Sequence, residues 1–74
     1  MAWSYDPTDL DTTTASGRLN TVRLLSGDTD TIDQQVQDEE IAFALLENSN
    51  KVYYSAAWIA RVISSKYSRK VTTN

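Results

Sequence analysis

The chain has 74 residues, 41% of them hydrophobic, with a formal net charge of −3 and neither cysteine nor histidine. This length accommodates one domain, and such domains bury only about 60% of the surface of the unfolded chain. Disulfides, metals or oligomerisation usually support them. Because cysteine and histidine are missing, disulfides, thiolate sites, the commonest zinc ligand and the usual general base are excluded. We therefore expect oligomerisation, in a compartment compatible with a reducing cytoplasm.

The charge is divided unevenly along the chain. Residues 1–50 hold all ten acidic residues against two arginines, a net charge of −8, whereas residues 51–74 hold five cations and no acid, a net charge of +5. Two interpretations stay open. The two halves form complementary surfaces on neighbouring copies, where charge pairing fixes the register of a contact, or they pair within one chain.

The sequence predicts an extended N-terminal arm over residues 1–15 and a helical domain over residues 16–74. The arm contains an Asp-Pro step, three consecutive threonines and three aspartates, a composition that cannot build a core. Trp3 and Tyr5 stand out, and an extended backbone would point both to one side. We expect them to dock on a neighbour or another partner; the alternative is a loose terminus in which Trp3 contacts its own domain.

Three helices are predicted in the remaining sequence. The first runs from about Gly17 to Ser26, with Ser16 as its N-cap and Gly27 as the residue that ends it. Its inward side chains are Leu19, Val22 and Leu25. Residues 32–37 are a connector. The second helix begins at Asp38 or one residue earlier, and the three acids at 38–40 lie at the positive end of the helix dipole. Its inward side chains are Ile41, Ala42, Leu45 and Leu46, with Phe43 off that face as a further contact.

The third predicted helix extends from Lys51 to Val71, with Asn50 as its cap, and pairs with the second helix as an antiparallel hairpin. At helical spacing its inner face comprises Val52, Ala56, Ile59, Ala60, Ile63 and Tyr67. The opposite face comprises Tyr54, Trp58, Val62 and Ser65, with Arg61 and Arg69 among them. A helix that is hydrophobic around most of its circumference is normally buried on both sides. One face suffices to cover so small a chain, so we expect the other to contact another molecule.

The candidate contact residues are therefore Tyr54, Trp58, Arg61 and Arg69, together with Trp3 and Tyr5 of the arm. Tryptophan and tyrosine dominate interface hot spots because they bury a large area at small entropic cost. The alternative for Trp58 is that it covers an open edge of its own domain.

Other classes of function receive little support. Nucleophilic catalysis lacks a histidine or cysteine base, glycines are too few for a phosphate-binding loop, and we expect no enzyme and no cofactor. Asp28, Asp30 and Asp33 do not match a calcium loop, because Ile32 occupies the fifth position, so no metal site is expected. We expect neither a signal peptide nor a membrane span, because residues 1–10 lack an apolar core and the longest uncharged apolar stretch is far shorter than about 20 residues.

The order of several short stretches resembles small tailed-phage head–tail connector proteins, also called adaptor or head-completion proteins. The stretches are V-R-L-L-S-G-D-T-D at residues 22–30, D-E-E-I at 38–41, and an alanine-bearing helix that ends S-R-K-V at 68–71. The resemblance covers about residues 18–71. Gln37 departs from the serine or threonine usual before D-E-E-I. Many relatives continue beyond the position of Val71, so this chain is either a minimal version or shortened, and a portal contact made by a C-terminal extension cannot be placed on it.

The resemblance implies an all-α fold, a small three-helix domain with an extended arm that oligomerises into a ring. It implies a structural virion protein, made in the bacterial host cytoplasm and located in the neck at the head–tail interface. Its partners would be copies of itself, commonly as a dodecamer, the portal protein and the next tail or neck component. DNA would pass through the channel without sequence-specific binding. The alternative is a small helical regulator that binds nucleic acid through the basic C-terminal half, of which a basic patch is the electrostatic sign.

Overall fold

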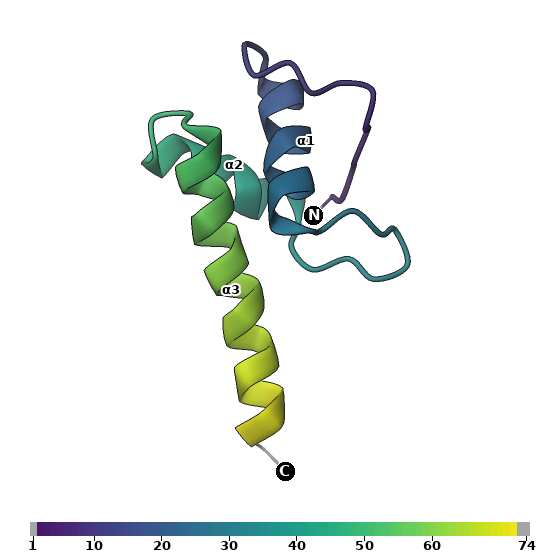
Figure 1. Cartoon of the computed structure of the whole chain (residues 1–74), viewed down its shortest axis with the longest axis vertical. Coiled ribbons are helices and arrows are strands. Elements are labelled where there is room, and N and C mark those ends of the chain that lie inside the picture. The colour runs from purple at the N-terminus through teal and green to yellow at the C-terminus, as the bar shows by residue number, and fades with distance from the viewer. Residues whose placement is uncertain (1, 73–74) are drawn as a thin grey trace.

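The protein is built from three helices, with no strand among the residues described (Figure 1). The computed structural model describes residues 2–72, and side chains for residues 2–67. Helix α1 spans Ala15–Ser26, α2 spans Asp38–Glu47 and α3 spans Val52–Thr72. The all-helical architecture predicted from the sequence is thereby confirmed.

Helix α1 begins earlier than predicted, because Thr14 and not Ser16 caps it. The Thr14 hydroxyl accepts a hydrogen bond from the Gly17 backbone N–H at 3.0 Å, which satisfies one of the free donors of the first turn. Ser16 lies inside the helix, and its hydroxyl donates to the Asp9 carboxylate. The predicted end is confirmed: Gly27 has a φ of 82° and its N–H bonds to carbonyls of the last turn.

Helix α2 begins at Asp38 as predicted, and the Glu40 carboxylate accepts a hydrogen bond from the Gln37 N–H at 3.2 Å. The chain then reverses through Ser49 and Asn50, which have φ values of 54° and 62°. Asn50 is therefore a left-handed turn residue and not the predicted cap of α3. The first turn of α3 instead closes on the carbonyl of Lys51, which accepts from the Ser55 N–H.

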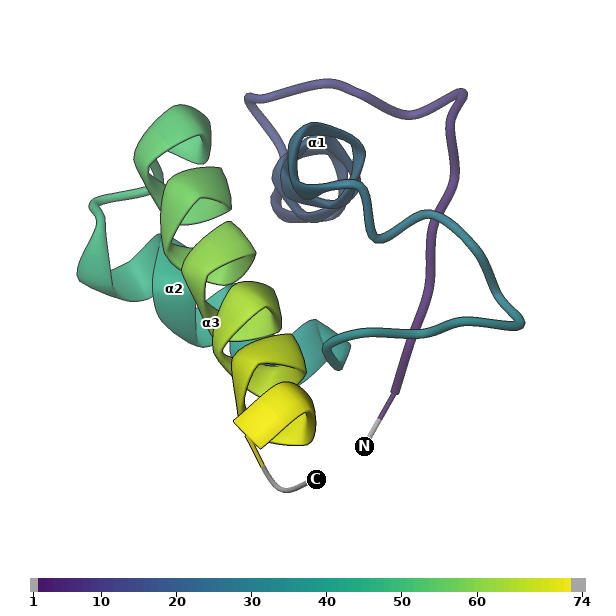
Figure 2. The same cartoon turned by 60° about the horizontal axis from the view of Figure 1, so that its bottom comes forward.

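The core lies where the first half of α3 meets the two shorter helices. In Figure 1 the second half of α3 extends beyond them, and Figure 2 shows α1 and α2 on different sides of α3. The buried apolar residues come from all three helices and from the connector: Val22, Val36, Ile41, Ala44, Leu45, Ala56 and Ile59. Val36 shows that the connector contributes a core side chain, which the sequence did not predict.

The inner face of α3 is rotated relative to the prediction. Ala60 and Tyr67 are exposed, whereas Ser55 is buried and Val62 packs against the core. The rotation follows from the position of α2, which contacts α3 on the side of Val62. Ser55 tolerates burial because its hydroxyl donates to the Ala44 carbonyl at 3.4 Å.

The apolar stripes of the shorter helices are also narrower than predicted. Leu25 is exposed on α1, and on α2 Ala42 and Leu46 are exposed while Ala44 is buried. Leu46 has 74% of its surface in solvent. Two short helices that pack on only part of a third leave much of their own circumference uncovered.

Candidate interface surface and the polar network behind it

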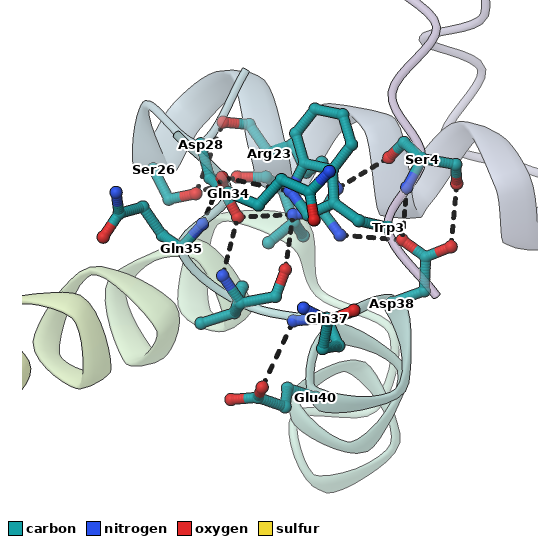
Figure 3. Close-up of polar contacts among 12 residues, drawn as sticks. Trp3, Ser4, Arg23, Ser26, Asp28, Gln34, Gln35, Gln37, Asp38 and Glu40 are labelled. Carbon is teal, nitrogen blue, oxygen red and sulfur yellow. Dashed lines mark hydrogen bonds and ion pairs between the residues drawn. The ribbon is translucent and has the colours of Figure 1, made fainter. Parts of the chain in front are cut away.

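A fully buried arginine lies at the junction of the arm, α1, the connector and α2 (Figure 3). Arg23 is 0% exposed. Its Nε donates to the Ser4 carbonyl at 2.7 Å, Nη1 donates to the Val36 carbonyl at 3.1 Å and forms an ion pair with Asp28, and Nη2 forms an ion pair with Asp38 at 2.7 Å. A buried charge requires such pairing, because its desolvation is otherwise prohibitive.

Asp28 is the second buried centre of this polar network. Its Oδ1 accepts hydrogen bonds from the Trp3 indole N–H at 3.2 Å and the Gln35 backbone N–H at 3.0 Å. Its Oδ2 accepts from the Val36 N–H at 3.0 Å in addition to its ion pair with Arg23. The carboxylate therefore fixes the base of the connector and the first residues of the arm at one point.

The arm docks on its own chain through the same network. The Arg23 guanidinium lies 4.6 Å from the centroid of the Trp3 ring, a cation–π contact. Ser4 donates from its N–H and its hydroxyl to the two carboxylate oxygens of Asp38, at 3.0 and 2.8 Å. The Ala2 carbonyl accepts from the Asp38 N–H at 2.6 Å. Residues 2–4 are therefore hydrogen-bonded across the start of α2, and we call this segment the strap.

Two carboxylates at the start of α2 have lowered pKa values. Burial by itself would raise the pKa of Asp38, but the hydrogen bonds from Arg23 and Ser4 outweigh it and lower the pKa below its ordinary value. The backbone hydrogen bond from Ala2 lowers the pKa of Glu39. Both acids are thus held in the charged form that retains the strap.

The second face of α3 is largely exposed, and together with Phe43 of α2 it forms a surface that we call the outer face. Trp58 retains 38% exposure, and its ring makes an edge-on contact with Phe43 of α2, the centroids 6.1 Å apart. Tyr54 is exposed one turn earlier, with the Lys51 ammonium 5.7 Å from its ring centroid. The outer face comprises Phe43, Tyr54, Trp58, Arg61, Val62 and Ser65.

Two shallow depressions adjoin on the outer face, separated by Trp58 and Val62. One is lined by Trp58, Arg61, Val62 and Ser65. The other lies between α2 and α3 and is lined by Glu39, Glu40, Phe43, Trp58, Ile59 and Val62. The surface thus has an apolar centre, an arginine at one side and two carboxylates at the other. That pattern suits contact with a protein, since interfaces combine an apolar core with a charged rim.

The structure brings together only part of the predicted contact set. Tyr54, Trp58 and Arg61 lie on the outer face, whereas Trp3 lies in the polar network. Tyr5 is half-buried beside the start of α1, where it lines a shallow groove with Asp9 and other residues. The Arg69 side chain lies outside the described residues.

Sequence reasoning missed the joint role of Arg23, Asp28 and Asp38. Each has an ordinary explanation as a helix-end or turn residue, which conceals that they pair. One feature of the sequence could have pointed to their shared role. All three residues fall in the stretches that carry the resemblance to connector proteins.

Among the described residues, no helix has the length and hydropathy to cross a membrane, and no three metal-ligating side chains gather. Comparison of the chain with family models, curated proteins and solved structures gave no match. The geometry of the outer face and the polar network is therefore the basis for assigning a function.

Proposed function

We propose that the chain is a non-enzymatic subunit of a tailed-phage head–tail connector, which assembles with copies of itself into a ring, commonly a dodecamer. The ring lies in the neck of the virion, between the portal and the next tail or neck component. It continues the channel through which DNA passes, without sequence-specific contact. The protein is made in the cytoplasm of the bacterial host.

The exposed outer face carries this proposal. Phe43, Tyr54 and Trp58 leave aromatic surface in solvent on a domain whose core is already closed on the other side of α3. Aromatic clusters flanked by arginine are typical of the anchors that dominate protein–protein interfaces. A small domain without disulfides gains the burial it lacks when such a face is covered by a neighbour.

The polar network supports the proposal in a second way. It joins the arm, α1, the connector and α2 into one unit, against which the inner face of α3 packs. Arg23, Asp28 and Asp38, the residues of the connector-like stretches, thus have a structural role. The contact surfaces then belong to other residues, above all those of α3.

The test is native mass spectrometry of the full chain, alone and mixed with the portal protein encoded by the same phage. We expect a closed oligomer, or a fixed number of copies bound to each portal ring. A chain that stays monomeric alone and does not bind the portal would overturn the proposal. Retention of random-sequence duplex DNA, weakening steeply with added salt, would then favour the nucleic-acid regulator.

A further inference from the structure

Among the side chains that the structure describes, the most exposed large apolar one does not belong to the outer face. Ile32 lies in the middle of the loop of residues 27–37 that joins α1 to α2, which we call the connector loop, and it is 93% exposed. Figures 1 and 2 both show this loop bulging away from α3 before it returns to the start of α2. Near that return the Gln35 carbonyl accepts a hydrogen bond from Lys66 Nζ of α3. The exposed Ile32 side chain is a small apolar projection, which we call the knob, whereas the outer face carries shallow depressions with apolar lining.

Hydrogen bonds within the connector loop hold the backbone on both sides of Ile32 in place. The Asp30 carboxylate accepts from the Ile32 N–H at 2.9 Å, and the Asp30 carbonyl accepts from the Asp33 N–H at 3.0 Å. Gln35 donates to the Asp33 carboxylate at 2.8 Å, and Asp28 fixes the base of the loop from within the polar network. Because the loop is ordered before any contact, docking Ile32 costs little conformational entropy.

The charges around the two surfaces are opposite. Asp30 and Asp33 flank the isoleucine, and both are exposed. Exposed Arg61 borders the depression formed with Trp58, Val62 and Ser65. Complementary charges at the rim fix the register of an apolar contact and favour one orientation over others.

From this we infer that the connector loop of one copy docks Ile32 into the Trp58–Val62–Ser65 depression of the next copy, with Asp33 facing Arg61. The inference rests on the proposed function and adds to it the partner surface. Because the two surfaces are different, the contact is heterologous and repeats around a ring when the rotation between copies closes.

The chain contains no cysteine, so crosslinking provides a clean test. Thr31, beside the knob, and Ser65, in the depression, are both exposed. In the assembled protein the double variant Thr31→Cys/Ser65→Cys is expected to give a disulfide-linked ladder of trimers and larger species. Each single variant can give no more than dimers, which makes the two single variants the matched controls.

Adding Ile32→Asp to the double-cysteine variant is expected to weaken the contact about tenfold or more and to remove the ladder. Adding Leu46→Asp, at another large exposed apolar residue, is expected to leave the ladder intact. Arg61→Asp is expected to weaken assembly, and Asp33→Lys in the same chain is expected to restore it.

Assembly without a ladder, and unaffected by Ile32→Asp, would overturn the inference while the proposed function stands. Failure of the unsubstituted chain to assemble, alone or on the portal, would overturn both. Native mass spectrometry of the unsubstituted chain tells these two failures apart.

Discussion

The indole ring of Trp3 lies over the guanidinium of Arg23, with the Arg23 Cζ atom 4.6 Å from the ring centroid. The indole N–H also reaches the Asp28 carboxylate at 3.2 Å, so one side chain of the arm contacts both members of a buried ion pair. The arm is consequently part of the folded unit, and Trp3 is its anchor.

Removing that anchor is expected to destabilise the protein. Trp3→Ala loses the cation–π contact, the apolar contact and one hydrogen bond, and should lower the free energy of unfolding by about 2–3 kcal/mol. Trp3→Phe keeps a ring over Arg23 but not the N–H donor, and should cost about 1 kcal/mol. Chemical denaturation of the two variants checks the ordering; equal losses would show that the ring contact contributes nothing.

Arg23 is expected to be far more sensitive than the exposed arginine of α3. Arg23→Met leaves Asp28 and Asp38 without their cation and should lower the free energy of unfolding by about 3–5 kcal/mol. The same exchange at Arg61, which is exposed, should change it by no more than about 0.5 kcal/mol. The pair is matched in chemistry, so similar denaturation midpoints for both variants would argue against the polar network as a support of the fold.

Stability is expected to fall in acid. The pKa of Asp38 is lowered in the folded protein, so the unfolded chain takes up a proton first as the pH drops below the ordinary value of 3.8. The contribution of this carboxylate is complete above that value and is lost as the pH falls through the folded pKa. Denaturation at a series of pH values measures the slope, and Asp38→Asn should make it shallower. An unchanged slope in that variant would assign the acid sensitivity to other groups.

The two glycines are expected to respond differently to alanine. A Cβ at Gly17 would lie 1.8 Å from the Asp11 carbonyl oxygen, so Gly17→Ala must displace the arm from α1. Gly27 has open space around it and a φ of +82°, so Gly27→Ala incurs only backbone strain of about 1–2 kcal/mol. Hydrogen exchange should show faster exchange at arm amides in the first variant alone. Equal protection of the arm in both variants would refute the close packing of Asp11 on α1.

The helices were predictable because the residues at their ends favour helix termination or helix initiation by local interactions. Gly27 needs a left-handed conformation and Asp38 begins a run of acids at a helix start, and both boundaries are confirmed. The cap at Thr14 was not distinguishable from one at Ser16, since both are good capping residues one turn from a plausible partner.

Long-range contacts were not predictable in the same way. The sequence pattern of α3 shows two apolar faces but not which side α2 covers, so the burial of Ser55 and the core contact of Val62 were not predicted. The network around Arg23 joins residues from four segments, and nothing local marks an arginine on α1 as buried. The outer face follows from periodicity alone, which is why Tyr54, Trp58 and Arg61 were predicted together.

The most direct test of the proposed function is sedimentation velocity of two matched variants, each mixed with the portal protein that this proposal gives as the partner. Trp58 lies on the outer face, whereas Tyr53 is 75% exposed and is placed about 140° away around α3 by the helical period. We predict that Trp58→Ala sediments as a free monomer while Tyr53→Ala assembles like the unsubstituted chain. Assembly of Trp58→Ala that is indistinguishable from that of Tyr53→Ala would contradict the outer face as the contact between subunits.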